Sequence, residues 1–229
     1  MKSLVIIPAR GGSKGIPYKN IKSLNGKPLI CYAIDVARQI VPDIQICVTT
    51  EDDEIIKVVE NYGLKVPFKR PDDLATDICG TYDVLIHAMS FYEDQGLKYN
   101  NIILLQPTSP FRKAEHVKEA MSLYSADIDM VVSVKEVVAN PYYNCFEETT
   151  EGYLHVSKGD GQLIRRQDAP KAWEFNGAIY VINPESLKKW SLGNFKKRVK
   201  YVMDDIHSID LDTMFDWTLA ELMIKEKLV

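Results

Sequence analysis

The fold of this chain is decided by residues 4–15, which read Leu4-Val5-Ile6-Ile7-Pro8-Ala9-Arg10-Gly11-Gly12-Ser13-Lys14-Gly15. The first four residues form a continuous apolar run that a proline ends, the pattern of a strand buried on both faces of a parallel sheet. Three glycines follow, and glycine lets backbone N–H groups approach a bulky anion closely. The stretch therefore predicts a central strand that delivers an anion-binding loop to the carboxyl edge of a sheet.

Outward from this stretch, helical and extended patterns alternate along most of the chain. Helices are predicted, from apolar residues that recur on one face, at 28–39, 52–61, 82–92, 114–124 and 213–227. Strands are predicted at 44–49, 65–68, 102–105, 130–134, 178–182 and 199–202. This alternation indicates an α/β protein with a mostly parallel sheet and helices on both faces, formed as a single domain over residues 1–229.

Residues 138–173 interrupt the alternation. This segment mixes polar, charged and aromatic residues, with Gly152, Gly159 and Gly161 between short extended pieces. It is too long for a plain loop inside a compact domain, and its aromatic residues favour burial. We therefore expect a β-rich insertion that pairs two subunits.

The composition excludes several classes of protein. The chain has 229 residues, of which 46% are hydrophobic and 26% charged, and its net charge is −4. An acidic chain lacks the overall field that nucleic-acid binding requires. No apolar stretch approaches the roughly 18 residues of a membrane span, and the first apolar run is too short for a signal peptide. The four cysteines show no disulfide spacing, which is typical of a reducing compartment. Together these observations predict a cytoplasmic protein that has neither nucleic acid nor membrane as a partner.

Three positive charges accompany the glycine-rich loop, on Arg10, Lys14 and Lys19. Such a loop suits a triphosphate, whose charge needs paired cations when it leaves water. The spacing matches neither the phosphate-binding pattern G-x-x-x-x-G-K-[ST] nor the dinucleotide pattern G-x-G-x-x-G. A solvated basic turn is the alternative. Because the loop follows a central strand, we favour phosphate binding.

Asp210 and Asp212 form an acidic pair near the end of the sequence. Alternate residues of an extended segment point the same way, so both carboxylates can reach one hard cation. Mg²⁺, or Mn²⁺ in its place, prefers a few carboxylates together with substrate phosphates. The alternative is that Asp212 caps the closing helix and Asp210 is merely exposed. The metal interpretation requires the pair to face the basic loop across one cleft.

Five blocks of sequence resemble the family of CMP-sialic acid synthetases, also called acylneuraminate cytidylyltransferases. The first runs from residue 7 to residue 29, and the others follow in the family's order over nearly the whole chain. They are Arg70-Pro71 with Leu74-Ala75-Thr76-Asp77, Leu105-Gln106-Pro107-Thr108-Ser109-Pro110 with Arg112, Asn176-Gly177-Ala178-Ile179-Tyr180, and Ile209-Asp210-Leu211-Asp212-Thr213. The resemblance implies a Rossmann-like nucleotidyltransferase fold whose insertion serves dimerisation.

The resemblance also implies which residues bind CTP. The basic residues of the loop and the acidic pair would form the catalytic set, Arg10, Lys14, Lys19, Asp210 and Asp212. Asn20 and Arg70 would meet the ribose and the cytosine. The other residues expected at the nucleotide are Ala9, Arg10, Gly11, Asp77 and Thr81. Thr81 departs from the family pattern, which commonly has serine there.

A second group of residues is expected at the acceptor sugar. Gln106 ends an apolar strand, and its family counterpart reaches the acceptor, whereas a solvated strand end is the alternative. Thr108 belongs to the same matching block as Gln106, and Asn176 to the same block as Tyr180, so both are also expected at the acceptor sugar. Tyr180 would line the sugar pocket, as its family counterpart does, and a core tyrosine is the alternative.

Arg165 and Arg166 lie in the insertion, and a carboxylated sugar needs a cationic partner. Arginine gives that partner bidentate geometry, in its own subunit or in the other subunit of a homodimer. A solvated basic pair is an equal alternative, since surface charges often contribute little. The pair therefore stays a prediction that depends on where the insertion lies.

The expected reaction transfers CMP from CTP to the anomeric hydroxyl of a nine-carbon 2-keto-sugar acid and releases pyrophosphate. In-line attack at the α-phosphorus needs positioning and charge neutralisation more than covalent chemistry. The base is left open between Asp212 and a metal-bound hydroxide. The alternatives are a glycosyltransferase of related fold that uses a nucleotide sugar, and a non-catalytic nucleotide- or sugar-binding regulator. The sequence leaves the particular nonulosonic acid open.

Overall fold

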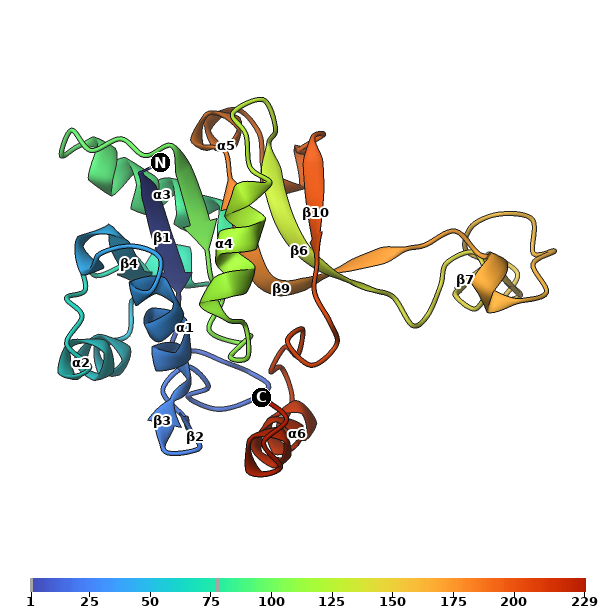
Figure 1. Cartoon of the computed structure of the whole chain (residues 1–229), viewed down its shortest axis with the longest axis horizontal. Helices are drawn as coiled ribbons and strands as arrows, with labels where there is room; N and C mark the ends of the chain where they lie inside the picture. Colours follow the sequence, from blue (N-terminus) through green and yellow to red (C-terminus); the bar gives the residue numbers. More distant parts are fainter. Residues whose placement is uncertain (1, 77–78) are drawn as a thin grey trace.

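The computed structural model describes residues 2–76 and 79–229, and within them a six-stranded sheet forms the centre of the molecule (Figure 1). The strands lie in the order β10-β6-β9-β5-β1-β4. Their bounds are Ser3–Pro8 for β1, Ile46–Thr49 for β4, Asn101–Leu104 for β5, Met130–Glu136 for β6, Trp173–Ile182 for β9 and Arg198–Val202 for β10. The central strand expected from residues 4–7 is β1, which pairs with β4 and β5.

The sheet is mostly parallel, as predicted, but β9 runs antiparallel to both of its neighbours, β5 and β6. Val181 of β9 pairs with Ile103 on one side and with Val131 on the other. Because β9 is reversed, its amino end lies at the edge where the other five strands have their carboxyl ends. Residues that begin β9 and residues that follow β1, β4, β5 and β10 therefore share one edge of the sheet.

Different helices cover the two faces of the sheet. Side chains alternate along a strand, so Val5 and Ile7 point to one face while Leu4 and Ile6 point to the other. The first face is covered by α1 (Leu29–Arg38), α2 (Asp53–Asn61) and α4 (Ala114–Ser122). The opposite face is covered by α3 (Thr81–Glu93) and α5 (Pro184–Lys189). The expectation of helices on both faces is confirmed, and no described helix is long and apolar enough to cross a membrane.

Some predicted elements differ from the structure. The strand expected at 65–68 does not form in the described residues, where a single bridge joins Lys69 to Thr50. Pro67 has no N–H to offer to the edge of β4, which explains why no ladder develops. The strand expected at 44–49 starts at Ile46, because Asp43–Gln45 form a 3₁₀ turn. The helix α5 was not predicted, since a six-residue helix shows no clear periodicity.

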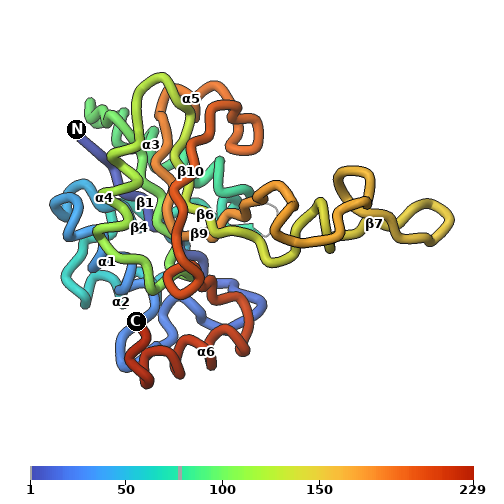
Figure 2. Tube along the Cα trace, turned by 45° about the vertical axis from the view of Figure 1, so that its right-hand side comes forward, coloured from blue at the N-terminus to red at the C-terminus, as the bar shows by residue number. Residues whose placement is uncertain are grey.

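An arm leaves the body of the molecule between β6 and β9 (Figures 1 and 2). It corresponds to the insertion expected at residues 138–173. It carries a single hairpin of two three-residue strands, β7 (Phe146–Glu148) and β8 (Leu154–Val156). The arm is therefore poorer in β-structure than the sequence predicts, because turns at glycines with positive φ separate its extended pieces.

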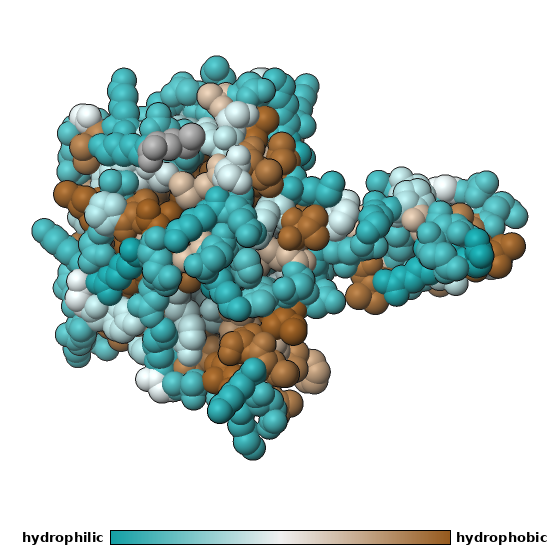
Figure 3. All heavy atoms as spheres, in the orientation of Figure 1, coloured by the Kyte–Doolittle hydropathy of each residue, from teal (hydrophilic) through white to brown (hydrophobic). Residues whose placement is uncertain are grey.

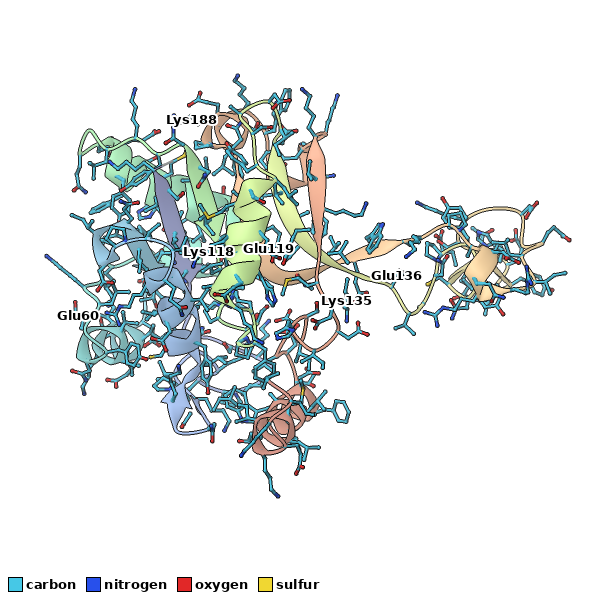
Figure 4. The ribbon with its side chains drawn as sticks, viewed as in Figure 1. Glu60, Lys118, Glu119, Lys135, Glu136 and Lys188 are labelled. Carbon is cyan, nitrogen blue, oxygen red and sulfur yellow. The ribbon has the colours of Figure 1, made fainter. Side chains whose placement is uncertain are left out.

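The root of the arm is a continuation of β6 and β9. Beyond an irregularity in the ladder, Lys135 pairs with Glu174 and Glu136 with Trp173, and Figure 4 labels Lys135 and Glu136 there. Salt bridges of 2.9 Å join Lys135 to Glu174 and Glu136 to Lys171. Partly exposed ion pairs contribute little by themselves, so the shared backbone ladder sets the direction in which the arm leaves.

The closing helix α6 (Met214–Lys225) lies next to the segment that follows β1, beyond the carboxyl edge of the sheet (Figures 1 and 2). This segment contains a small hairpin, β2 (Ser23–Leu24) and β3 (Lys27–Pro28). Trp217 of α6 is 1% exposed and belongs to an apolar cluster with Ile16 and Leu24. Apolar packing therefore joins the two ends of the sequence at this edge.

We predict that Trp217→Ala lowers the free energy of unfolding by about 3–5 kcal/mol, because it leaves a cavity in this cluster. The matched control is Phe215→Ala on the same helix, since Phe215 is 77% exposed. That change should stay within about 0.5 kcal/mol. Urea unfolding followed by circular dichroism measures both values. Equal losses for the two variants would contradict the assignment of Trp217 to a core that joins the two ends of the sequence.

Candidate active site

Three adjoining cavities occur in the described part of the chain, two at the carboxyl edge of the sheet and a third that extends from Gln106 over one face of the sheet to the first residues of β6 and β10. The first, of about 330 Å³, is bounded by the loop after β1, by the residues after β5 and by Asp212. Pro8 and Arg10 also border the second, of about 290 Å³, and Gln106 also borders the third, of about 200 Å³. Thr81 lies between the second and the third. Because these cavities share lining residues, they lie side by side, and we refer to the three together as the cleft.

The basic loop and the acidic pair face each other across the first cavity. Lys19 Nζ donates a hydrogen bond of 2.7 Å to the carbonyl of Leu211 and lies 2.9 Å from Asp212 Oδ1. Arg10 and Lys14 line the same cavity. The loop and the acidic segment are also in close contact, since a Cβ on Gly15 would lie 2.2 Å from the carbonyl oxygen of Asp212. The expectation that one cleft holds both groups is confirmed.

The inner side of the loop is fixed by Asn20, which is buried. Its Nδ2 donates to the backbone carbonyl of Arg10 at 2.9 Å, and the backbone carbonyl of Asn20 accepts from the N–H of Ile30 at the start of α1. Tyr18 has a φ of +52°, a left-handed conformation that turns the chain just before Lys19. Asn20 lines the first cavity and its side-chain amide holds the loop in shape, so its expected contact with the ribose or cytosine stays a prediction.

A carboxylate that the sequence did not mark joins the basic loop to the wall of the second cavity. Glu51 Oε1 accepts a hydrogen bond of 2.8 Å from the backbone N–H of Gly11. Its other oxygen, Oε2, lies 2.5 Å from a terminal nitrogen of Arg70, which lines the second cavity. A Cβ at Gly11 would lie 2.1 Å from Asp52 Oδ2, so a side chain there would have to displace the carboxylate that caps α2. The position of Glu51, directly beyond β4 at the carboxyl edge, was a usable signal.

The other residues expected at the nucleotide differ in their surroundings. Thr81 is the first residue of α3 and lines the second and third cavities. Ala9 is buried, and its N–H donates to the carbonyl of Thr49 at 3.0 Å, so its N–H and its methyl group are engaged in the sheet and the core. Ala9 therefore shapes the start of the loop. Asp77 lies outside the described residues.

The two aspartates occupy different environments. Asp210 is half-buried, its Oδ1 has no hydrogen-bond partner among the described residues, and burial raises its pKa above the usual value. The hydroxyl of Thr108 and the charges of Lys19 and Arg112 act in the opposite direction on that pKa. The side chain of Asp212 is 72% exposed. The pair therefore combines an inner carboxylate, one oxygen of which has no hydrogen-bond partner among the described residues, with an outer one that lines the first cavity.

Asp212 does not cap the closing helix, so that alternative is wrong. The N-cap of α6 is Thr213, whose hydroxyl accepts from the N–H of Asp216 at 3.3 Å. Asp216 returns the contact, since its Oδ2 accepts from the N–H of Thr213 at 2.7 Å and from that of Asp212 at 3.1 Å. This capping box fixes the backbone of Asp212 and leaves its carboxylate available to the cleft.

The acidic pair fits a divalent cation that also binds a phosphate. No group of three His, Cys, Asp or Glu residues suited to a metal occurs in the described part of the chain. Mg²⁺ typically takes one or two carboxylates and completes its shell with water and phosphate oxygens. The buried, unpartnered Oδ1 of Asp210 is the kind of atom that such a cation satisfies. The residues present therefore suit Mg²⁺ or Mn²⁺ with a nucleotide.

The third cavity has a more apolar character. Gln106 lines both this cavity and the first, and Tyr180 also lines this one, while their expected contact with the acceptor sugar stays a prediction. Burial raises the pKa of Tyr180, which keeps its phenol neutral. The sequence analysis missed the other residues that line it, among them Leu104, Met130, Phe175, Leu192 and Arg198. Phe175 is exposed at the reversed start of β9, so no burial pattern marked it.

Asn176 lies beneath the cleft and lines none of its three cavities. Its Oδ1 accepts from the hydroxyl of Ser133 at 2.5 Å, and its Nδ2 donates to the hydroxyl of Ser208 at 2.9 Å. A buried amide with these partners has little capacity left for a ligand. In place of the expected substrate contact, the side chain of Asn176 holds the irregular part of β9 next to Gly177. Thr108 does line the first cavity, and its carbonyl accepts from Leu211 at 2.9 Å.

Arg165 and Arg166 lie in the arm and line none of the three cavities. Arg165 makes a bidentate pair with Asp168, at 2.8 and 3.0 Å, and both side chains are exposed. The arm projects away from the body that holds the cleft (Figure 2). The structure therefore does not bring either arginine to the cleft of its own chain, because the arm leaves the sheet as a continuation of β6 and β9.

A basic loop that faces an acidic pair at the carboxyl edge of such a sheet, beside a more apolar cavity, suits a nucleotidyltransferase. The family model described as cytidylyltransferase matches residues 4–221. The chain belongs to the cytidylyltransferase family. A solved CMP:2-keto-3-deoxy-manno-octonic acid synthetase, complexed with CTP, shares the fold with a TM-score of 0.72 at 18% identity, over 99% of this chain and 100% of that one. The Rossmann-like nucleotidyltransferase fold is confirmed.

Three proteins that are similar to this chain in sequence are named for different sugar acids. The CMP-N,N'-diacetyllegionaminic acid synthase of Legionella pneumophila is 32% identical over 98% of this chain and 97% of that protein. An N-acylneuraminate cytidylyltransferase of Streptococcus agalactiae is 38% identical over 95% of this chain, which spans only 52% of the length of that relative. The pseudaminic acid cytidylyltransferase of Campylobacter jejuni is 29% identical over 98% of this chain and 97% of that protein. The resemblance to CMP-sialic acid synthetases is confirmed.

We predict that Gly15→Ala lowers the free energy of unfolding by about 1–3 kcal/mol, because its Cβ would overlap the backbone oxygen of Asp212. Gly12→Ala is the matched control in the same loop, since a Cβ there meets no atom within 4 Å. That variant should be neutral or slightly more stable. Urea unfolding without nucleotide measures both. If Gly15→Ala were as stable as Gly12→Ala, the close packing of the loop against Asp212 would be refuted.

Proposed function

We propose that this chain transfers CMP from CTP to the anomeric hydroxyl of a nine-carbon 2-keto-sugar acid and releases pyrophosphate. The observation that carries the proposal is the meeting of Lys19 with Asp212 at 2.9 Å in a cavity that Gln106 also lines. This contact brings the expected phosphate site, the expected metal site and the expected acceptor contact to one cavity. Membership of a cytidylyltransferase family favours this reaction over a glycosyltransferase or a silent regulator.

The basic end of the cleft suits the triphosphate. Arg10, Lys14 and Lys19 line one cavity and would neutralise the phosphates and the departing pyrophosphate. Asp210 and Asp212 would hold Mg²⁺ or Mn²⁺, which supplies further charge neutralisation at the phosphates and makes a nearby hydroxyl more acidic. The residues of this chain then contribute by orienting the α-phosphate and the acceptor for in-line attack.

The second cavity suits the nucleoside. Arg70 and Thr81 line it, and Arg10 joins it to the phosphate end. Glu51 holds the guanidinium of Arg70 and the N–H of Gly11 at the same time, so the nucleoside side and the phosphate loop keep a fixed spacing. Such preorganisation lowers the entropy cost of binding a ligand that spans both.

The third cavity suits the acceptor. Gln106 offers an amide beside the phosphate end, and Tyr180 with apolar neighbours offers surface for the carbon chain and acyl groups of a nonulosonic acid. Relatives are named for N-acylneuraminate, N,N'-diacetyllegionaminic acid and pseudaminic acid. The acceptor class proposed is therefore a sialic-acid-type sugar acid.

We further propose a cytoplasmic homodimer in which the arm contacts the partner. Phe146, Leu154 and Ile164 of the arm are exposed, and the space-filling view shows apolar patches on the arm (Figure 3). Exposed apolar residues in a small arm favour burial against another surface. Arg165 and Arg166 would then be available to the acceptor carboxylate of the partner. Free thiols at Cys31, Cys47, Cys79 and Cys145 suit a reducing compartment.

Pyrophosphate release from CTP tests the proposed reaction. The panel of acceptors comprises N-acetylneuraminate, its deaminated analogue, N,N'-diacetyllegionaminate and pseudaminate, with the eight-carbon 2-keto-3-deoxy-manno-octonate as a shorter control. We expect release that requires one of the nine-carbon acids and a divalent cation, with the matching CMP-sugar as product. Turnover of a CMP-sugar without CTP, or no turnover of any acid in the panel, would reject the proposal.

We predict that Asp210→Asn and Asp212→Asn each lower kcat/KM by about 100-fold or more, because a charged contact to the nucleotide complex is lost. Asp205→Asn is the matched control, since this exposed aspartate lies in the same connection and its side chain lines none of the three cavities. Its activity should stay within about twofold. Electron paramagnetic resonance of added Mn²⁺, with CTP present, gives a readout without turnover. Wild-type Mn²⁺ affinity in both Asn variants would exclude the assigned site.

A further inference from the structure

A buried arginine that the proposed reaction does not use lies directly beneath the acceptor end of the cleft. Arg112 follows the β5 loop and is 3% exposed. One terminal nitrogen donates to the carbonyl of Ala178 at 2.8 Å, and the other donates to the carbonyl of Gln106. The two terminal nitrogens of one guanidinium therefore hold two backbone segments together. Ala178 lies 66 residues from Arg112 in the sequence, and Gln106 lies 6 residues from it.

These two segments carry the groups that meet at the border of the first and third cavities. Gln106 provides the amide that faces both. Ala178 follows Gly177, whose backbone is so close to that amide that a Cβ would lie 2.7 Å from Gln106 Oε1 and 3.4 Å from Asp210 Oδ2. A small shift of either segment would therefore move the Gln106 side chain relative to Asp210.

Stability alone does not account for an arginine at this place. Its Nε has no partner in the part of the chain that the structure describes, and burial lowers the pKa of Arg112 to about 9, with Asp210 opposing that effect. Burying a cation with incomplete hydrogen bonding is costly, and an apolar residue of similar volume often stabilises a protein as well or better. A geometric role explains the residue, since only a planar fork serves two carbonyls at fixed positions.

We propose that Arg112 is a positioning residue for the acceptor, which fixes the Gln106 amide by holding the backbone at Gln106 and at Ala178 together. The inference rests on the proposed function, because it assigns the acceptor to the cavity that Gln106 borders. Lysine cannot replace the fork, since one ammonium group on a flexible stem cannot hold both carbonyls in the same geometry. Arg112 itself touches no ligand.

The chain contains a matched comparison for this residue. Arg70 is also buried, at 4% exposure, and also lies at the carboxyl edge. Its guanidinium pairs with Glu51, which accepts from the N–H of Gly11 in the phosphate loop. The two arginines are therefore alike in burial but belong to different ends of the cleft, so a general effect of losing a buried guanidinium should look the same in both variants.

The first test compares Arg112→Lys with Arg70→Lys in steady-state kinetics, with CTP and the acid that the wild-type protein turns over in the panel above. For Arg112→Lys we expect the acceptor KM to rise about tenfold, the effect of losing one charged hydrogen bond, while the CTP KM stays within about twofold. For Arg70→Lys we expect the reverse. Equal changes in the two KM values for Arg112→Lys, or no change in the acceptor KM, would overturn the proposal.

The second test needs no turnover and keeps the proposal falsifiable if the acceptor class is wrong. Amide hydrogen exchange, measured by mass spectrometry on the ligand-free protein, compares Arg112→Lys with wild type. We expect faster exchange confined to residues 105–109 and 176–180, with the loop at 9–20 and strand β4 unchanged. Uniformly faster exchange would mean a merely structural role, and unchanged exchange at 105–109 would remove the positioning role. If the wild-type protein were inactive with every acid in the panel but Arg112→Lys showed the local exchange pattern, only the proposed function would be rejected.

Discussion

Lys19 and Asp212 lie 193 positions apart in the sequence, and their side chains meet at 2.9 Å. A single contact between partly exposed charges contributes little to stability, so it does not hold the two ends together by itself. The apolar cluster around Trp217 does that, because it packs α6 against the segment that follows β1. The ion pair then sets the position of the basic loop relative to the acidic segment. The proposed chemistry of the cleft depends on that relative position.

The acceptor end of the cleft depends on the reversal of β9. A parallel strand in that place would bring its carboxyl end to this edge, and Phe175 and Gly177 would lie at the opposite end of the sheet. The antiparallel strand instead brings its irregular part at Gly177 against Gln106 and Asp210. Its close approach is available only to glycine there, since φ is +73° and a Cβ would overlap Gln106.

The chain has a net charge of −4, so its overall field does not attract anionic substrates. Affinity for the proposed substrates, CTP and a sugar acid, would therefore have to come from local cations held in fixed positions. Two buried arginines hold the backbone around these cations and around Gln106: Arg70 pairs with Glu51, which accepts from Gly11 in the basic loop, and Arg112 donates to the carbonyls of Gln106 and Ala178. Charges next to the protein interior interact more strongly than the same charges on an open surface.

Local sequence alone determined the strand β1, the glycine-rich basic loop after it, most helices and the faces they bury, because burial leaves a period of 2 or 3.6 in the chain. The five matching blocks also placed Lys19, Gln106, Tyr180 and Asp212 in one cleft. Only the tertiary structure decided the direction of β9, the partnership of Glu51 with Gly11, the burial of Asn176 and the distance of Arg165 from the cleft. Those properties depend on how remote segments pair and where the chain leaves the sheet, and neither leaves a periodic pattern in the residues concerned.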